Sequence, residues 1–360
     1  MDVRGAGPGQ SQAERHGELS SAEQSASGGL RNLALSRGEV DRSTARRTDT
    51  AWLAAAWADP DTRVVVVEDG QAPVRFRDGD TGDGDGDTGE DGGRGAAAGA
   101  QELVFVSPEQ APDGVRFLLG SDADGVVYFG VAGSLPEDLW PGLGPDVRPV
   151  GLRQAGPLLS DRDVGLMTHA VALANWHGSH GHCPRCGAVT EPALAGHSRR
   201  CVNDGSEHFP RLDPAVIMLV TDPGDRCLLA RNALWPKGRM SVLAGFVEPG
   251  ESAEHAVVRE VFEEVAIVVG QVRYLGSQPW PMPRSLMLGY QAVAAAGQSI
   301  TVDEEEIGEA RWFTRAEMRA AIDTGQLGVA PSSSIARRLI EYWYGAERPD
   351  GSAGWTAAAR

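Results

Sequence analysis

Three glutamates close together in the chain are the residues best suited to chemistry. Glu260, Glu263 and Glu264 are spaced so that their carboxylates would share one face of a helix. That helix is predicted by a start signal at Ser252 and by apolar residues at helical spacing: Ala256, Val257, Val261 and Val265. Like charges so placed destabilise a helix, whereas Mg²⁺ or Mn²⁺ takes oxygen ligands and shares them with substrate phosphates. The stretch therefore predicts a divalent-metal site, with a solvated acidic face as the alternative.

Cysteines form a second candidate site. Cys183 and Cys186 make a C-x-x-C, and Cys201 follows after fourteen residues, so three quarters of a zinc ribbon are present. A closed zinc site takes four ligands, and the candidates for the fourth are Asp204, His208 and His197. The alternative is a ribbon that has lost its metal. Cys227 lies in an apolar stretch and is expected to pack in a core.

A proline-rich segment follows the acidic helix. Pro279, Pro281 and Pro283 lie within residues 277–287. Because proline lacks an N–H donor, this segment is expected to be neither a helix nor a central strand. We expect a rigid loop held near the acids, and the alternative is a stiff connector around a core Trp280.

Composition limits the class of protein. The 360 residues, 41% hydrophobic, suit two or three domains with full cores. The longest apolar run, residues 215–220, is too short for a membrane span, and the N-terminus lacks an apolar signal segment. With cysteines better suited to metal than to disulfides, these features predict a cytoplasmic protein with no membrane partner. The net charge of −17 argues against sequence-independent binding to long nucleic acid, but not against a nucleotide or an RNA end.

Patterning divides the chain into five stretches. Residues 1–48 are expected to be a disordered tail and residues 347–360 a flexible one, since such composition cannot offset ordering entropy. Residues 49–160 are predicted to form an α+β domain with a disordered acidic insertion at 78–100, which lacks the Gly and Glu of a calcium loop. Residues 161–211 would form a connecting helix and a zinc-ribbon-like segment. Residues 212–346 read as mixed strands with helices on both faces.

The residues around the three glutamates resemble the Nudix box, the signature of hydrolases that cleave a nucleoside diphosphate linked to another group. Gly245, Glu251 and Arg259 stand at the spacing of that box. Ala266 stands where the box has Gly, which predicts a different helix C-cap or about 1 kcal/mol of strain. Together with the C-x-x-C and the proline-rich segment, residues 150–344 resemble the NADH pyrophosphatase family of Nudix hydrolases.

The resemblance implies an α/β fold. The expected architecture is a Nudix α/β/α sandwich preceded by a zinc-ribbon-like segment and a small α+β N-terminal domain. It also implies catalytic Mg²⁺ or Mn²⁺, one structural Zn²⁺, and a homodimer whose active sites draw on both chains.

Carried over position by position, the resemblance makes Glu260, Glu263 and Glu264 catalytic. These three, Glu306 and the Ala244 carbonyl would be the ligands of Mg²⁺ or Mn²⁺. Phe209, at a family Tyr, and Phe246 would enclose a base, and Arg153 is a weak match to a substrate arginine. The other substrate contacts would come from the proline-rich segment, with Met282 replacing the commoner Phe, and from a backbone contact at Ala336: Gln278, Pro279, Trp280, Pro281, Met282, Pro283, Arg284, Ser285 and Ala336.

The activity that the resemblance implies is metal-dependent hydrolysis of the diphosphate of NADH or NAD⁺, giving nicotinamide mononucleotide and AMP. Removal of NAD caps from RNA 5′ ends by the same site is the alternative. A non-catalytic nucleotide-sensing module is a third hypothesis. It is disfavoured because all the acids are present and no helix-turn-helix or basic stretch is there to act through.

Overall fold

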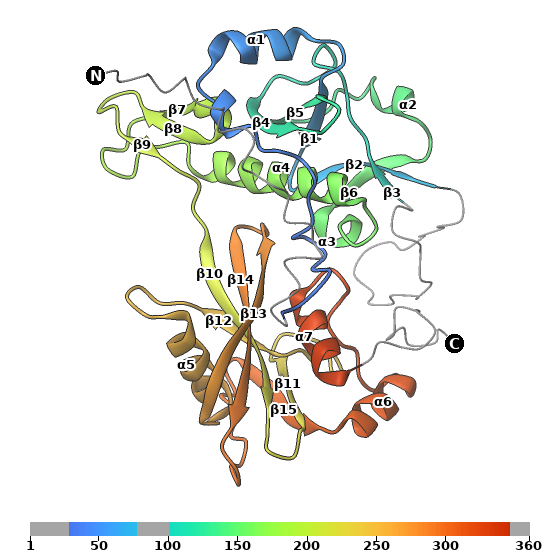
Figure 1. Ribbon diagram of the computed structural model, residues 1–360, viewed down its shortest axis with the longest axis vertical. Helices are drawn as coiled ribbons and strands as arrows, with labels where there is room; N and C mark the ends of the chain where they lie inside the picture. Colours follow the sequence, from blue (N-terminus) through green and yellow to red (C-terminus); the bar gives the residue numbers. More distant parts are fainter. Residues whose placement is uncertain (1–28, 78–100, 346–360) are drawn as a thin grey trace, which may run out of the picture.

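The computed structural model describes residues 29–77 and 101–345. The expected acidic insertion at 78–100, the expected tail at 347–360 and the first 28 residues of the expected N-terminal tail lie outside them. The described chain forms two lobes, with the N-terminal domain and the ribbon in the upper one of Figure 1 and a larger sheet in the lower one. None of the described helices combines the length and apolar character that crossing a bilayer requires.

A six-stranded mixed sheet is the centre of the lower lobe. Its order is β13-β14-β10-β11-β15, with β12 paired to β10, and only the β10–β14 pair is parallel. The bounds are β10 Asp213–Thr221, β11 Cys227–Asn232, β12 Leu243–Phe246, β13 Val269–Trp280, β14 Ser285–Ala294 and β15 Ile307–Phe313. The helices are α5 Ala253–Val265, α6 Arg315–Asp323 and α7 Ile335–Tyr344.

Alternating residues of the sheet feed two separate cores. In β10, Val216 and Met218 face the core that α5 covers, whereas Ile217 and Leu219 face the core that α6 and α7 cover. The expected α/β/α sandwich is therefore confirmed, with α5 on one face and α6 and α7 on the other (Figure 1). Cys227 is buried in the second core, as expected.

The N-terminal domain, in the upper lobe, contains two small sheets around one long helix. One sheet has the order β1-β5-β4 and the other β3-β2-β6. The strand bounds are β1 Arg63–Val67, β2 Gln71–Phe76, β3 Gln101–Leu103, β4 Val115–Ser121, β5 Val127–Ala132 and β6 Val147–Gly151. The helices are η3 Thr44–Arg46, α1 Thr50–Ala58, α2 Trp140–Leu143, α3 Leu152–Ala155 and α4 Asp161–Ser179.

Two features of this lobe differ from the expected organisation. Helix α4, assigned from the sequence to a connecting segment, buries Val164, Met167 and Val171 in the core of the N-terminal domain. Strands β2 and β6 are not among the expected elements, and each contains a proline. Pro73 and Pro149 stand opposite each other, so the two missing N–H donors fall at one register position.

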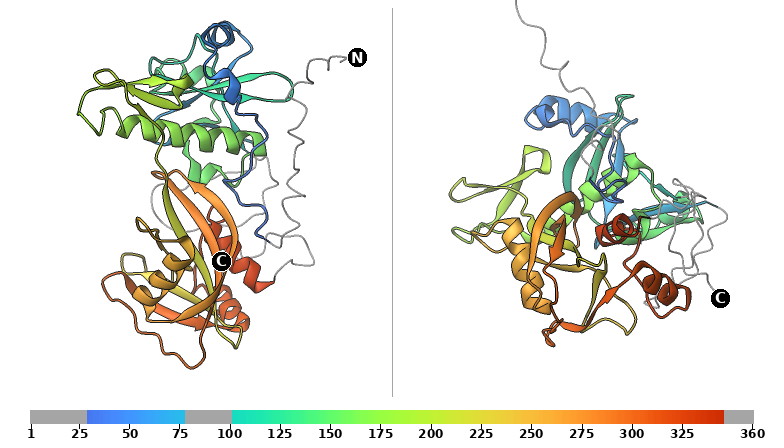
Figure 2. Two further views of the ribbon diagram at one scale, coloured as in Figure 1. Left: turned by 60° about the vertical axis from the view of Figure 1, so that its left-hand side comes forward. Right: turned by 60° about the horizontal axis from the view of Figure 1, so that its bottom comes forward.

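Residues 29–48 are not the disordered tail that was expected. Leu35 is buried in the core of the upper lobe and Leu33 in a core of the lower one. The Leu30 amide donates to the Leu275 carbonyl at 2.8 Å, and Asp41 forms a bridge with Ser121. Figures 1 and 2 show this segment, in blue, running down from the upper lobe to the lower one. Two leucines help to order it because each is buried in the core of a different lobe.

Candidate functional site

The three glutamates lie on α5 as expected. Ser252 is the N-cap, and its hydroxyl accepts from the His255 amide at 3.2 Å. At the other end Ala266 has φ 57° and ψ 30°, the left-handed conformation that glycine adopts without cost. Of the two outcomes expected for Ala266, the helix thus keeps the usual C-cap geometry and carries the strain, which is about 1 kcal/mol.

Arg259 organises the acids next to it. Its guanidinium donates to Glu260 and Glu263, each at 2.8 Å, and to both carboxylate oxygens of Glu251 at 2.9 and 2.8 Å. It also donates to the Phe246 carbonyl at 2.9 Å, which ties α5 to strand β12. The bidentate pair with Glu251 fixes the plane of the guanidinium and so holds these charged side chains in a rigid arrangement.

Glu264 is the most unusual group of the cluster. Its side chain is 7% exposed, and its Oε2 atom has no hydrogen-bond partner among the described residues. Burial, together with the negative charges of Glu260, Glu306 and Glu263, raises the pKa of Glu264 to about 8. Burial also raises the pKa of Glu260, where the charges of Glu263 and Glu306 act in the same direction.

Glu306 reaches the cluster from a distant part of the chain. It lies in the loop before β15, where the Asp303 amide donates to the Glu264 carbonyl at 3.0 Å. The Glu306 carbonyl accepts from the Ala233 amide at 2.8 Å. Four neighbouring carboxylates, of which Glu260 and Glu264 have a raised pKa and Glu264 has a buried oxygen without a partner among the described residues, fit a divalent cation.

Gly245 is required by this packing. A Cβ atom at this position would lie 1.9 Å from the Glu260 carboxylate carbon, so any other residue would displace the acid. Ala244, whose carbonyl was predicted as a ligand, precedes Gly245 on β12 and is exposed.

The proline-rich segment is only partly the loop that was expected. Residues 277–280 continue β13 and Ser285 begins β14, which leaves 281–284 as the turn between them. Pro279 is compatible with β13 because β13 is an edge strand, paired on one side only. Gln278 is fully buried, and its amide donates to the Ser333 carbonyl at 2.9 Å. Arg284 donates to Asp213 at 2.7 Å.

The two predicted base-stacking rings are exposed. Phe209 is 53% and Phe246 58% exposed, and no ring contact between them is found within residues 29–77 and 101–345. Ala336 is buried at the start of α7, and its amide donates to the N-cap hydroxyl of Ser334 at 3.2 Å. Trp280 and Met282 pack against the core of the N-terminal domain, with the Arg153 guanidinium 5.3 Å from the Trp280 ring centre. The proline-rich segment therefore lies between the two lobes.

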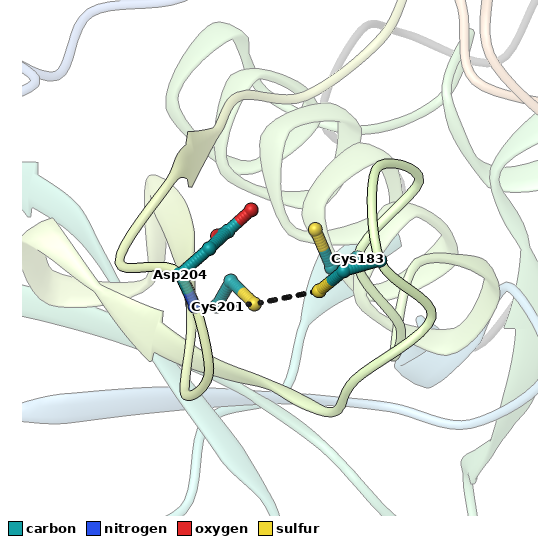
Figure 3. A group of neighbouring side chains, drawn as sticks. Cys183, Cys201 and Asp204 are labelled. Carbon is teal, nitrogen blue, oxygen red and sulfur yellow. Dashed lines mark hydrogen bonds between the residues drawn. The ribbon is translucent and has the colours of Figure 1, made fainter.

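The cysteines gather in the ribbon, whose strands are β7 Thr190–Ala193, β8 Ser198–Cys201 and β9 Glu207–His208, with η4 Leu194–Gly196 between the first two. Single ligand atoms of Cys183, Cys186, Cys201 and Asp204 lie within 4.8 Å of one another. Figure 3 shows the side chains of Cys183, Cys201 and Asp204 turned toward a common centre. Three thiols and a carboxylate at this separation suit a tetrahedral zinc ion.

The other candidates for the fourth ligand are placed differently. His208 contacts the Ser206 hydroxyl at 3.1 Å, and that hydroxyl donates to Asp204 at 2.5 Å and lies 3.6 Å from the Cys183 sulfur. The His208 side chain also hydrogen-bonds to the Cys183 thiol, but His208 is not among the four residues whose ligand atoms all lie within 4.8 Å of one another. His197 is buried against β4, and its Nε2 atom lies 2.7 Å from the carbonyl oxygen of Leu118.

Sequence reasoning missed Asn175 and Ser333, which contact the proline-rich segment. The Asn175 amide reaches the turn at 281–284, and Ser333 holds Gln278. Neither residue belongs to a local pattern, and the one available signal was an amide in the last turns of α4 where a helix former would be expected.

Comparison with protein-family models matches three consecutive stretches of the chain. Residues 60–176 match the NADH pyrophosphatase-like rudimentary NUDIX domain, residues 179–209 the NADH pyrophosphatase zinc ribbon domain, and residues 211–331 the NUDIX domain.

Two curated bacterial relatives match over most of the chain, and a human one matches over about half of it. The NAD-capped RNA hydrolase NudC of Mycobacterium bovis (strain BCG / Pasteur 1173P2) is 40% identical over 330 residues, which cover 87% of this chain and 95% of that protein. NudC of Mycobacterium tuberculosis (strain ATCC 25618 / H37Rv) has the same identity and coverage. NAD-capped RNA hydrolase NUDT12 of Homo sapiens is 41% identical over 197 residues, 51% of this chain and 42% of that protein.

Proposed function

The chain belongs to the NADH pyrophosphatase family of the Nudix hydrolases, and from this premise we propose that it hydrolyses the diphosphate bond of NAD(H). The substrate is NADH or NAD⁺, either free or as the cap of an RNA 5′ end. The products are AMP, or RNA beginning with a 5′-monophosphate, and nicotinamide mononucleotide.

One observation carries the proposal: the buried, unpartnered Oε2 atom of Glu264 amid Glu260, Glu263 and Glu306. An acid in this position would stay protonated near neutral pH unless a cation compensates its charge. We propose that the four glutamates and the Ala244 carbonyl hold Mg²⁺ or Mn²⁺. When bound, the metal neutralises the two phosphates and lowers the pKa of a water ligand.

The chain's own residues then position the reaction. Arg259 keeps Glu260 and Glu263 at one edge of the cluster, and Gly245 lets the Glu260 carboxylate approach β12. A glutamate among Glu263, Glu264 and Glu306 accepts the proton of the attacking water. The segment 278–285, with the backbone at Ala336 and the rings of Phe209 and Phe246, binds the dinucleotide.

The ribbon has a structural role in this proposal. Cys183, Cys186, Cys201 and Asp204 hold one zinc ion, which ties the two knuckles of the ribbon together. His208 supports Asp204 through Ser206.

We also propose that the chain is a homodimer. Exposed apolar side chains lie on the ribbon and on the first part of the lower lobe: Val189, Val202, Phe209, Leu212 and Phe246. The Val202 amide donates to the Val189 carbonyl at 3.2 Å, so the first two are neighbours. A second copy of this chain would cover such a surface and bring its Phe209 to a site on the first. Sedimentation that finds only monomer at micromolar concentration would contradict this.

Product analysis tests the function. The protein is incubated with NADH, NAD⁺ and NAD-capped RNA, each with Mg²⁺ or Mn²⁺, and the products are identified by mass spectrometry. We expect cleavage within the diphosphate, and the ratio of kcat/KM values ranks the free dinucleotide against the cap.

The matched variant is Glu264→Gln, which keeps the size of the side chain but removes its charge. We expect its turnover to fall at least about 100-fold with an unchanged melting temperature, because the ligand charge is lost while the buried contacts remain. Wild-type turnover in this variant at saturating metal would contradict the proposed role of Glu264 as a metal ligand.

A further inference from the structure

The turn at 281–284 makes a contact with the upper lobe that the proposed function does not use. The side-chain amide of Asn175, on α4, donates to the Pro281 carbonyl at 2.7 Å and to the Pro283 carbonyl at 3.4 Å. No other donor within the described residues reaches these two carbonyls. Both views in Figure 2 show the hairpin of β13 and β14 rising from the lower lobe toward α4.

The rest of the turn is fixed from the lower lobe. The Met282 amide donates to the Trp280 carbonyl at 2.8 Å, and the Arg284 carbonyl accepts from the Asp213 amide at 3.0 Å. Only the carbonyls of Pro281 and Pro283, which lie between these two anchors, depend on the other lobe. Pro281 and Pro283 have no N–H of their own, so the turn has few ways to stabilise itself internally.

The amide is unusual in its own helix. Asn is a poor helix former, and its polar side chain competes with the backbone for hydrogen bonds. Asn175 nonetheless lies within the last turns of α4, half-buried beside the buried residues Trp176 and His177. Its cost to the helix is offset by the bonds across the lobes rather than by bonds within α4.

We propose that Asn175 is a positioning residue for the dinucleotide: it holds the turn 281–284 from the upper lobe and so orients Trp280 and Arg284 for substrate. This inference rests on the proposed function of segment 278–285. The amide fits this role because one NH₂ group can donate two hydrogen bonds, here to two carbonyls that are two residues apart. A loop ordered before binding does not have to be ordered by the substrate, which lowers KM.

The test compares three variants of the full chain with NADH. Asn175→Ala removes the amide, and Asn175→Asp keeps its shape but replaces the NH₂ donor with a carboxylate that repels the carbonyls. Gly178→Asp is the control, because it adds the same charge three residues further along α4, at an exposed position where a side chain meets nothing within 4 Å, and leaves the amide in place. Initial rates over a range of NADH give kcat and KM, and thermal melting reports stability.

We expect KM to rise about 5- to 10-fold in both Asn175 variants, the amount that one or two hydrogen bonds account for. We expect kcat to stay within about twofold of wild type, since the acids are untouched, and Gly178→Asp to keep the wild-type KM. A purely structural role would give the opposite pattern: partial unfolding lowers the active fraction, and hence kcat, without moving KM.

A wild-type KM in both Asn175 variants would overturn the inference, as would a fall in kcat alone. An equal rise of KM in Gly178→Asp would also overturn it, because charge and not the lost donor would then be the cause. Failure of the proposed function is separate, since it would appear as absent NADH hydrolysis in the wild-type protein.

Discussion

At the scale of single residues, Asp204 is where this chain departs from a ribbon closed by four thiols. Its Oδ1 atom accepts from the amide and the hydroxyl of Ser206, at 2.9 and 2.5 Å. These bonds, with the hydrogen bond of the Cys201 side chain, lower the pKa of Asp204 to about 2. The carboxylate is therefore charged and oriented, which are the two properties a metal ligand needs.

We expect Asp204→Ala to weaken zinc binding at least about 10-fold and His208→Ala to weaken it less, because only Asp204 lies within the cluster of ligand atoms. Competition with a chromophoric chelator measures the affinity, and elemental analysis of protein purified without chelator should give near one zinc per wild-type chain. Asp204→Cys is the control that restores a fourth thiolate. Loss of zinc in His208→Ala but not in Asp204→Ala would identify the histidine as the ligand.

At the scale of elements, α4 and the ribbon meet through buried histidines. His177 on α4 donates from Nε2 to the Gly196 carbonyl at 2.8 Å, and its Nδ1 accepts from Arg199 of β8 at 2.9 Å. His169 and His197 pack against each other nearby, with ring centres 5.2 Å apart. If the Nδ1 atom of His177 were protonated, it could no longer accept this hydrogen bond, and the imidazolium charge would lie beside the Arg199 guanidinium. Burial, followed by the charge of Arg199, lowers the pKa of His177 to about 4 despite the bond to Gly196.

This contact predicts acid sensitivity. In the unfolded chain His177 titrates near 6.5, so between pH 6.5 and 4 the unfolded state binds more protons and the free energy of unfolding falls as pH falls. We expect this one group to contribute about 2 kcal/mol to the difference in unfolding free energy between pH 7.5 and pH 5. Urea denaturation of wild type and His177→Gln at both values of pH measures it.

The glutamine variant is expected to be less stable at pH 7.5 but to lose less stability on acidification, since it cannot take up the proton. His255→Gln, an exposed position on α5, is the control and should follow the wild type. Equal loss of stability in wild type and His177→Gln would show that other groups cause the acid sensitivity.

At the scale of the whole molecule, residues 29–48 fasten the two lobes together. Arg37 donates to Asp161 at 2.6 Å and to the carbonyls of Gly156 and Leu159 at 2.8 and 3.1 Å, all in the upper lobe. Ser36 donates to the Ser277 carbonyl of β13 at 2.9 Å, in the lower lobe. This segment and Asn175 contact β13 and the turn beyond it, so the position of the proline-rich segment depends on how the lobes are held.

We expect Arg37→Ala to lower the free energy of unfolding by about 2 kcal/mol, because a largely buried guanidinium leaves an acid and two carbonyls without their donor. Hydrogen exchange should increase at residues 275–277 of β13 as the segment loosens. Arg46→Ala is the matched control, since its ion pair with Asp49 is solvent-exposed and long at 3.4 Å. Equal effects of the two substitutions would mean that residues 29–48 do not fasten the lobes.

Local spacing determined much of the chemistry from the sequence alone. Glu260, Glu263 and Glu264 share a face because helix geometry places residues three and four apart together, and the same rule supplied the apolar face that docks α5 on the sheet. The sandwich followed from alternating strands and capped helices. The thiols of Cys183, Cys186 and Cys201 followed from knuckle spacing.

Tertiary structure alone decided the contacts between residues distant in the chain. The unpartnered oxygen of Glu264, the approach of Glu306, the amide of Asn175 over the turn and the docking of Leu33 and Leu35 have no periodic signature. The physical reason is that such contacts form only when burial in two packed lobes outweighs the entropy of closing long loops. A sequence pattern shows which residues share an element, but the packing of elements decides which side chains meet.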